Sequence, residues 1–347
     1  MENKEFENLL SLLESKNETD ISAGLLLAQK HQEMFKNYFG FEVKELQELV
    51  DFLSQKKALK LKKPLLQMEK LNLDRKKITS FPNSVLLLKN LLELNLRNNQ
   101  LKNLPAEITN LEHLKFLLLE KNKLESLPAE IGNLTNLMNL FLDTNQLKTI
   151  RSEIGKLTNL LNLYLANNKV QILPSEIGNL INLVTLNFSD NELQNLPPEI
   201  GNLKNLYRLR SQNNQLKNLP KEIGNLENLQ ELYLTGNQLQ TLPSEFGNLK
   251  KLWFLYLQDN QLQTLPKEFT NLENLQRLYL GNNQLKNLPE NIGKLKKLEF
   301  LRVSDNPLEA LPDSLCNLEN LKVIYVFGTP ENMIISEKLK EMNVLVY

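Results

Sequence analysis

The chain has 347 residues, and its 41 lysines and arginines are balanced by 41 aspartates and glutamates. Without net charge it has no long-range attraction for nucleic acid or an anionic membrane, so nucleic-acid binding is not expected. One cysteine, Cys316, and two histidines, His31 and His113, cannot form a disulfide framework, a tetrahedral zinc site or a cysteine–histidine nucleophile pair. We therefore expect neither a metal nor a cofactor.

Residues 1–64 show the periodicity of helices, with apolar side chains in three runs at 6–13, 25–38 and 43–53. Asp20 or Ser22 is placed to cap the second helix and Gly40 to end it. Residues 60–64 form a short basic link. We predict that these residues form a three-helix N-terminal cap, which covers the exposed core at the start of the repeated sequence described below. The alternative is a separate binding domain.

The first sixteen residues are acidic and amphipathic, and they lack the basic and apolar stretches of a secretory signal. No segment approaches ~18 uninterrupted apolar residues, so no membrane span is expected. The sequence predicts a cytoplasmic protein. The alternatives are secretion by a route without a visible signal peptide, or a signal that has already been removed.

From Met68 to Asn320 one pattern recurs every 23 residues through eleven units, without insertion or deletion. Residues 160–182 carry it as Leu-x-x-Leu-x-Leu-x-x-Asn-x-Val-x-x-Leu-Pro-x-x-Ile-x-x-Leu-x-Asn. A twelfth, degenerate unit begins at Leu321. Positions within each repeat are numbered from 1 to 23 below. Met68 is position 1 of the first repeat, and position 1 recurs every 23 residues after it.

Within each unit, apolar positions 4 and 6 alternate with outward positions 3, 5 and 7, which is the period of a half-buried strand. Proline at position 15 interrupts helix formation on the opposite side. The asparagines at position 9 are expected to form a buried structural ladder. We predict an α/β solenoid at 65–328 with a parallel sheet on its concave face. A C-terminal cap at 329–347 would hold a helix at 330–342 and a strand at 344–347.

The repeat resembles the 23-residue leucine-rich repeat class found in bacterial proteins and in cytoplasmic Ras-group scaffolds. Segments 127–134 and 219–226, each Leu-Pro-x-Glu-Ile-Gly-Asn-Leu, carry the resemblance. It implies a horseshoe-shaped solenoid that binds proteins. The sequence shows neither the catalytic cysteine domain of bacterial leucine-rich repeat ubiquitin ligases nor the phosphate loop of repeat-linked GTPases. We therefore expect no enzymatic activity.

Positions 3 and 5 point outward from the strands and carry two runs of aromatic residues, separated by a polar stretch with two arginines. Rigid tyrosine, tryptophan and arginine side chains are enriched where binding energy concentrates. The alternative is that tyrosines on adjacent strands only stack and rigidify the sheet. The predicted partner-binding residues are Phe116, Phe141, Tyr164, Arg208, Arg210, Tyr233, Trp253, Phe254, Tyr256, Arg277, Tyr279, Phe300, Arg302 and Tyr325.

These patterns together predict a monomeric, non-enzymatic scaffold that binds a protein or peptide partner on the concave face. One form of this function is a bacterial protein that engages host proteins. The alternative is a surface or secreted protein of adhesin type, which would have several weak partners instead of one saturable partner.

Overall fold

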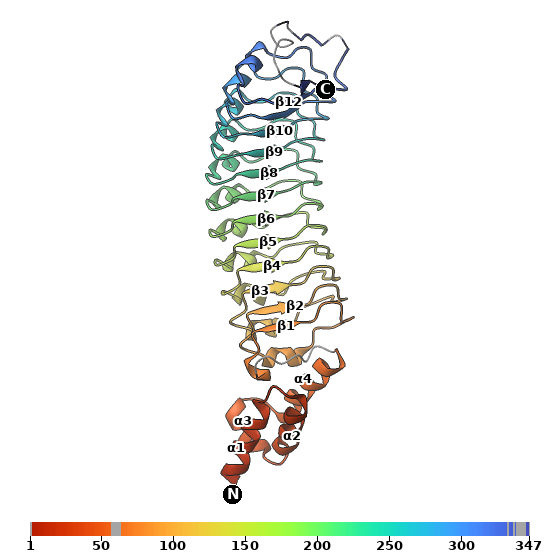
Figure 1. Cartoon of the computed structure of the whole chain (residues 1–347), viewed down its shortest axis with the longest axis vertical. Coiled ribbons are helices and arrows are strands. Elements are labelled where there is room, and N and C mark those ends of the chain that lie inside the picture. The colour runs from red at the N-terminus through yellow and green to blue at the C-terminus, as the bar shows by residue number, and fades with distance from the viewer. Residues whose placement is uncertain (1, 57–63, 332, 336, 338–344, 347) are drawn as a thin grey trace. The chain divides into compact units, whose positions relative to one another are not determined.

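The computed structural model describes residues 2–56, 64–331, 333–335, 337 and 345–346 (Figure 1). The chain forms two compact units, Met1–Gln146 and Leu147–Tyr347. The first unit, called unit 1 below, holds the N-terminal helices and the first repeats. The second, unit 2, holds the later repeats and the C-terminal strand.

The N-terminal segment forms four helices among the described residues, where three were predicted. The second predicted helix is interrupted because the backbone N–H groups of Lys30 and His31 bond to the carbonyls of Leu27 and Ala28, a tightened turn that ends a helix. Gly40 ends the next helix in the left-handed conformation, as expected, with φ of 77°. The helices are α1 (Glu2–Leu13), α2 (Glu18–Ala28), α3 (Gln32–Phe39) and α4 (Val43–Gln55).

Helix α4 connects the helical segment of unit 1 to the repeats. Its apolar side chains Leu46, Leu49 and Leu53 are buried, and the helix packs against the short helix η2 (Asn83–Leu87) in the first repeat. The N-terminal cap of α2 is Asn17, which accepts a hydrogen bond from a backbone N–H, and not Asp20 or Ser22. Most of the predicted basic link lies outside the described residues.

From Met68 to Tyr325 each repeat contributes one three-residue strand, and the strands are parallel. Equal positions of successive repeats pair, as Tyr256 does with Tyr279, so residues 23 apart lie side by side. Unit 1 contains β1 (Lys70–Asn72), β2 (Glu93–Asn95), β3 (Phe116–Leu118) and β4 (Asn139–Phe141). Unit 2 contains β5 (Asn162–Tyr164), β6 (Thr185–Asn187), β7 (Arg208–Arg210), β8 (Glu231–Tyr233), β9 (Phe254–Tyr256), β10 (Arg277–Tyr279), β11 (Phe300–Arg302), β12 (Val323–Tyr325) and β13 (Leu345–Val346).

Between β1 and β12, the side of each coil opposite the strands carries only short 3₁₀ helices. In most repeats the helix begins directly after the proline at position 15, and Arg151 takes the same place before η5. The predicted interruption of helix formation is therefore confirmed. These helices are η1 (Leu65–Gln67), η2, η3 (Ala106–Asn110), η4 (Ala129–Asn133), η5 (Ser152–Lys156), η6 (Ser175–Asn179), η7 (Pro198–Asn202), η8 (Lys221–Asn225), η9 (Ser244–Asn248), η10 (Lys267–Asn271), η11 (Ile292–Lys294) and η12 (Asp313–Asn317).

The asparagines at position 9, from Asn99 to Asn306, are all buried and form the expected ladder. Asn260 shows the pattern: its Oδ1 accepts the N–H of Leu239 at 3.1 Å, and its Nδ2 donates to the carbonyl of Leu234 at 3.0 Å. Both partners belong to the preceding repeat. Each buried amide thus satisfies backbone groups that no strand pairing reaches, and it ties one coil to the next.

The C-terminal segment differs from the predicted cap. The residues around Ile334 do not form a helix, because Ile334 makes an isolated parallel bridge to Ala310. Its N–H bonds to the carbonyl of Glu309, and its carbonyl accepts the N–H of Leu311. Further along the predicted helix, Glu337 is helical, and most of the other residues lie outside the described part of the chain. The expected final strand is present as β13, which pairs with β12.

Candidate protein-binding face

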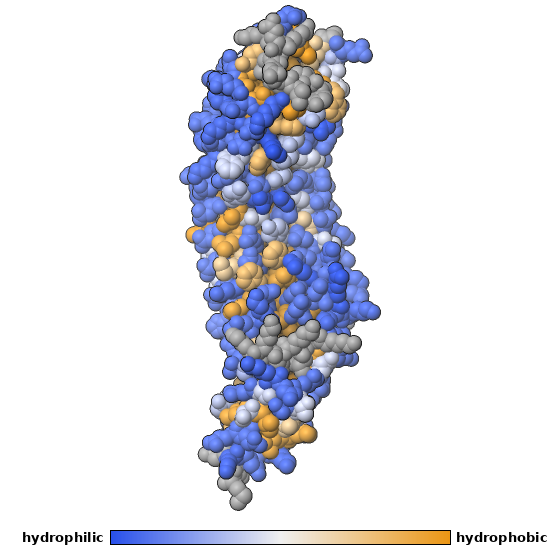
Figure 2. Space-filling model, viewed as in Figure 1, coloured by the Kyte–Doolittle hydropathy of each residue, from blue (hydrophilic) through white to orange (hydrophobic). Residues whose placement is uncertain are grey.

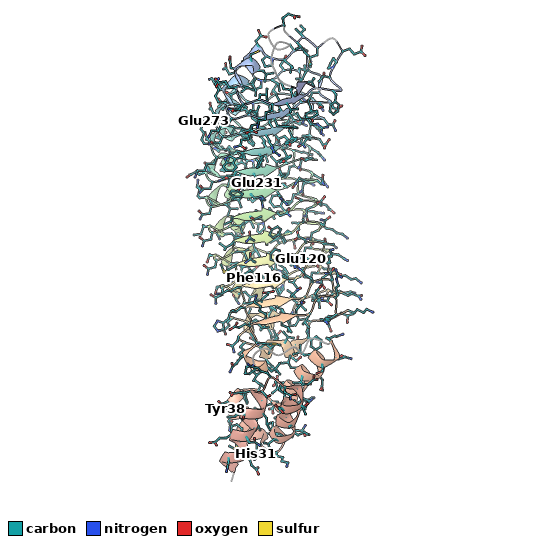
Figure 3. The ribbon with its side chains drawn as sticks, viewed as in Figure 1. His31, Tyr38, Phe116, Glu120, Glu231 and Glu273 are labelled. Carbon is teal, nitrogen blue, oxygen red and sulfur yellow. The ribbon has the colours of Figure 1, made fainter. Side chains whose placement is uncertain are left out.

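The solvent side of the sheet in unit 2 is formed by the side chains at positions 3 and 5 of β5 to β12, called the strand face below. On these strands the middle residue is buried in the core and its two neighbours point the other way, as in the pattern around Leu255. The face of the molecule seen in Figure 2 is mostly hydrophilic, with scattered hydrophobic patches. Figure 3 labels Glu231, which lies on β8 in this face.

Tyr233, Tyr256 and Tyr279 form a stacked row across β8, β9 and β10, called the tyrosine ladder below. Successive ring centroids lie 4.6 and 4.5 Å apart, with interplanar angles of 8° and 9°. This stacking follows from the strand register, since neighbouring strands are ~4.8 Å apart. The stacking given as the alternative in the sequence analysis is therefore present. The rings cover one another's faces, and all three side chains are half-buried.

The aromatic row continues beyond the ladder toward the C-terminus. Phe300 packs on Tyr279 at 4.8 Å between centroids and on Tyr325 at 5.4 Å, in tilted arrangements. Phe327, which the sequence analysis did not select, meets Tyr325 edge to face at 6.4 Å. Such contacts hold the side chains in fixed positions, so this end of the strand face is preorganised.

Arg208 is engaged within the protein and is not an open anchor for a partner. Its Nε and Nη2 donate to the two carboxylate oxygens of Glu231 at 2.5 and 2.6 Å. The hydroxyl of Tyr233 donates to the same carboxylate at 2.9 Å. Hydrogen bonding from Arg208 lowers the pKa of Glu231. Glu231 was not among the predicted residues, although its place 23 residues after Arg208 was a usable signal, because equal positions pair.

The other three predicted arginines of the strand face lie over aromatic rings. The guanidinium of Arg210 is 4.9 Å from the centroid of Tyr233, and that of Arg277 is 5.4 Å from Phe254. Arg302 lies 5.2 Å from the ring of Phe327. These cation–π contacts orient the charges at the surface without neutralising them.

The predicted residues are divided between the two units. Phe116 and Phe141 lie on β3 and β4 of unit 1, where Phe141 is covered by Arg97 at 5.5 Å. Arg97 is itself paired with Glu120, with 2.5 Å between Nη2 and Oε1; Phe116 and Glu120 are labelled in Figure 3. In unit 2, Tyr164 lies on β5. Trp253 borders the strand face from position 2 and is 39% exposed.

Alkaline titration should distinguish Tyr256 from ordinary tyrosines. Burial, followed by its neighbours Tyr279 and Tyr233, raises the pKa of Tyr256 to about 12, against ~10 in an unfolded chain. The stability contributed by its neutral form is therefore fully present below pH ~10 and is lost as the pH rises through about 12. We expect part of the phenolate absorbance of the native protein to appear only near pH 12, and we expect Tyr256→Phe to reduce that part. A titration of all eight tyrosines near pH ~10 would contradict this.

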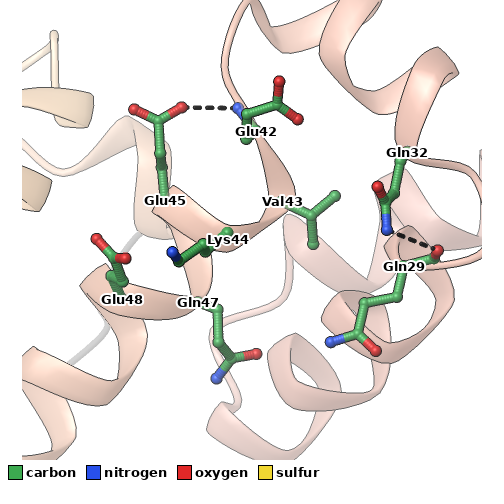
Figure 4. Close-up of a pocket in the computed structure, with 8 residues that line it drawn as sticks. All are labelled: Gln29, Gln32, Glu42, Val43, Lys44, Glu45, Gln47 and Glu48. Carbon is green, nitrogen blue, oxygen red and sulfur yellow. Dashed lines mark hydrogen bonds between the residues drawn. The ribbon is translucent and has the colours of Figure 1, made fainter.

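A hollow of about 570 Å³ lies in the helical segment and is shown in Figure 4. Two of its acidic side chains serve local structure: Glu45 accepts the backbone N–H of Glu42, and Glu42 pairs with Lys36. Within the described residues, no three histidine, cysteine, aspartate or glutamate side chains gather as metal ligands would. In the same part of the chain, no helix combines the length and apolar character that crossing a membrane requires.

The stacked coils, the asparagine ladder and the outward sheet define a repeat solenoid of the kind that presents a surface to partners. The chain belongs to the leucine-rich repeat family. A family model described as leucine-rich repeat region matches residues 27–166, 151–218 and 209–282, and a second leucine rich repeat model matches 263–308. Proteins with this fold are generally interaction modules. No curated protein matches the sequence.

Solved structures of other repeat proteins are similar to the chain. A leucine-rich repeat protein of Leptospira interrogans is 30% identical, with 81% of this chain and 96% of that chain covered and a TM-score of 0.51. A TDR receptor is 28% identical over 76% of this chain and 48% of its own, with a TM-score of 0.69. A chain from the octameric complex of Latrophilin 3, Unc5D and FLRT2 is 26% identical, covering 81% and 90%, with a TM-score of 0.64.

Proposed function

We propose that the protein is a non-enzymatic scaffold that binds a protein or peptide partner on the strand face of unit 2. The observation that carries this proposal is the tyrosine ladder, whose partly exposed, mutually stacked rings lie beside arginines held over aromatic side chains. Two of the similar structures, a receptor and a multiprotein complex, support a role in protein recognition. The similarity to a bacterial leucine-rich repeat protein of Leptospira interrogans supports a bacterial form of this role. That the partner of such a form is a host protein is part of the proposal.

The ladder has the physical properties of a binding platform. Each tyrosine is already fixed by its neighbours, so a partner does not have to order these side chains on binding. The ring edges provide apolar contact area and the hydroxyls provide hydrogen bonds, the combination that makes tyrosine common in interfaces. Arg277, which is exposed above Phe254, adds a charge that can orient the partner.

A second candidate function is adhesion through several weak contacts. It is favoured by large apolar side chains exposed outside the strand face, with Ile172 73% and Ile181 55% exposed. Exposed apolar groups of this kind can mark further contact surfaces. A scaffold and an adhesin differ in what they bind: one saturable partner in the first case, several weak ones in the second.

The test is affinity purification with the full chain and the Tyr256→Ala/Tyr279→Ala variant. Cytosolic and extracellular fractions of the source cell and of a host cell are used in parallel. The scaffold predicts one partner that the variant loses, and the fraction that yields it gives the compartment. Several weakly retained proteins that bind the variant equally well would contradict the scaffold and support adhesion.

A further inference from the structure

Two arginines at the ends of the tyrosine ladder have unsatisfied hydrogen-bonding groups. Arg210 and Arg302 both occupy position 5, on β7 and β11, and the ladder lies between them. In each, the Nε is buried and has no hydrogen-bond partner among the described residues. Buried donors without a partner are rare in folded proteins. A carboxylate at the surface that draws either guanidinium group outward would give its Nε an acceptor.

Each of these arginines lines a hollow in the surface. The hollow at Arg210 has a volume of about 590 Å³ and also contains Asn187, Ser189 and Gln212. The hollow at Arg302 has a volume of about 410 Å³ and includes Gln258 and Asn282. Both hollows are rich in side-chain amides, which can bond to a peptide backbone as well as to a carboxylate.

The charge of the strand face favours an acidic occupant. Positions 3 and 5 of β5 to β12 carry four arginines and one glutamate, and that glutamate, Glu231, is paired with Arg208. Arg210, Arg277 and Arg302 therefore leave an excess of positive charge at positions 3 and 5. A carboxylate meeting a guanidinium can form two parallel hydrogen bonds, which is the strongest pairing available to these side chains.

Three aspartates border the hollows from position 8, beyond the ends of the strands. Asp190 lines the first hollow and accepts a hydrogen bond from Asn213 at 2.7 Å. Asp259 and Asp305 line the second, and Asp259 accepts from Asn282 at 2.7 Å. These carboxylates repel an anion on one side of each hollow. They leave the side nearer the tyrosine ladder as the favourable approach for an acidic group.

We propose that the occupant is an extended acidic peptide segment that crosses the strands over the tyrosine ladder and places one carboxylate on Arg210 and a second on Arg302. This inference rests on the proposed function and specifies the partner's chemistry. The two arginines are four strands apart, or ~19 Å at ~4.8 Å per strand. An extended chain rises ~3.3 Å per residue, so the two acidic residues are about six positions apart.

The test is a selection of random 15-residue peptides, displayed on phage, against the immobilised full chain. Enriched peptides are then synthesised with a fluorescent label, and their affinities are measured by anisotropy. The variants are Arg210→Gln, Arg302→Gln and Arg210→Lys, the last of which keeps the charge but loses the planar pair of donors. The control Lys217→Gln/Lys286→Gln removes two positive charges from exposed residues at position 12, outside the strand face. Circular dichroism confirms that each variant is folded.

The inference predicts enriched peptides with two acidic residues five to seven positions apart. Arg210→Gln and Arg302→Gln should each weaken their binding at least tenfold, Arg210→Lys should also weaken it, and the lysine control should have little effect. Peptides that need Tyr256 but bind the arginine variants normally would overturn this inference and leave the proposed function standing. Failure to enrich any peptide that depends on Tyr256 would count against both.

Discussion

Replacing Asn260 with alanine should destabilise the protein by about 1–3 kcal/mol. The side chain of Asn260 accepts the N–H of Leu239 and donates to the carbonyls of Leu234, Leu257 and Gln258, at 3.0 to 3.1 Å. Alanine would leave these groups of two adjacent repeats without a partner in a region that water does not reach. Unsatisfied buried groups cost their full desolvation free energy, so the loss exceeds that of one exposed hydrogen bond.

The free energy of unfolding is measured by urea denaturation and compared with that of Asn218→Ala. Asn218 is an exposed asparagine at position 13, so the control makes the same chemical change at the surface. The control should lie within about 0.5 kcal/mol of the unaltered protein. Equal unfolding midpoints for the two variants would show that the ladder does not stabilise the repeats.

Replacing Tyr256 and Tyr279 together with alanine should weaken binding of the partner at least tenfold, which corresponds to ~1.4 kcal/mol or more. The substitution removes two of the three stacked rings and with them most of the fixed contact area of the tyrosine ladder. The two side chains are only partly buried, and the core beneath them is formed by Leu255 and Leu278, which remain. The protein should therefore stay folded.

Two further variants separate the causes of this loss. The Tyr256→Phe/Tyr279→Phe variant keeps the stacked rings but lacks the hydroxyls, so its affinity reports what hydrogen bonding contributes. Tyr38→Ala removes a tyrosine that is 61% exposed in the helical segment of unit 1, and it should leave affinity unchanged. If Tyr38→Ala weakens binding and the double alanine variant does not, the partner binds the N-terminal helices and not the strand face.

Most of the repeat architecture could be predicted because it depends on the 23-residue period alone. Equal positions pair across parallel strands, so the period placed Tyr233, Tyr256 and Tyr279 side by side. The short 3₁₀ helices followed from proline, which lacks the N–H that a longer helix needs. The asparagine ladder followed from a polar residue that recurs at an inward position.

The features that could not be predicted depend on contacts without a periodic signal. The bridge from Ile334 to Ala310 keeps the chain extended where its composition suggested a helix. The break between α2 and α3 arises from local backbone bonds that apolar spacing does not report. For the candidate site, the sequence selected Arg208 by residue type. The ion pair of Arg208 with Glu231 follows the 23-residue period and could have been found from it. Only the geometry shows that Arg210 and Arg302 retain unsatisfied donors.

The bonds of Asn260 to the N–H of Leu239 and the carbonyl of Leu234 also constrain how a chain of this kind can change length during evolution. They reach back 21 and 26 residues. Loss or gain of a single residue within a repeat would misalign donors and acceptors on both sides of the change. Duplication or loss of a whole 23-residue repeat would recreate every such bond between the new neighbours. Lineages carrying these repeats can therefore lengthen or shorten the sheet by whole repeats, while each remaining repeat keeps its own hydrogen bonds.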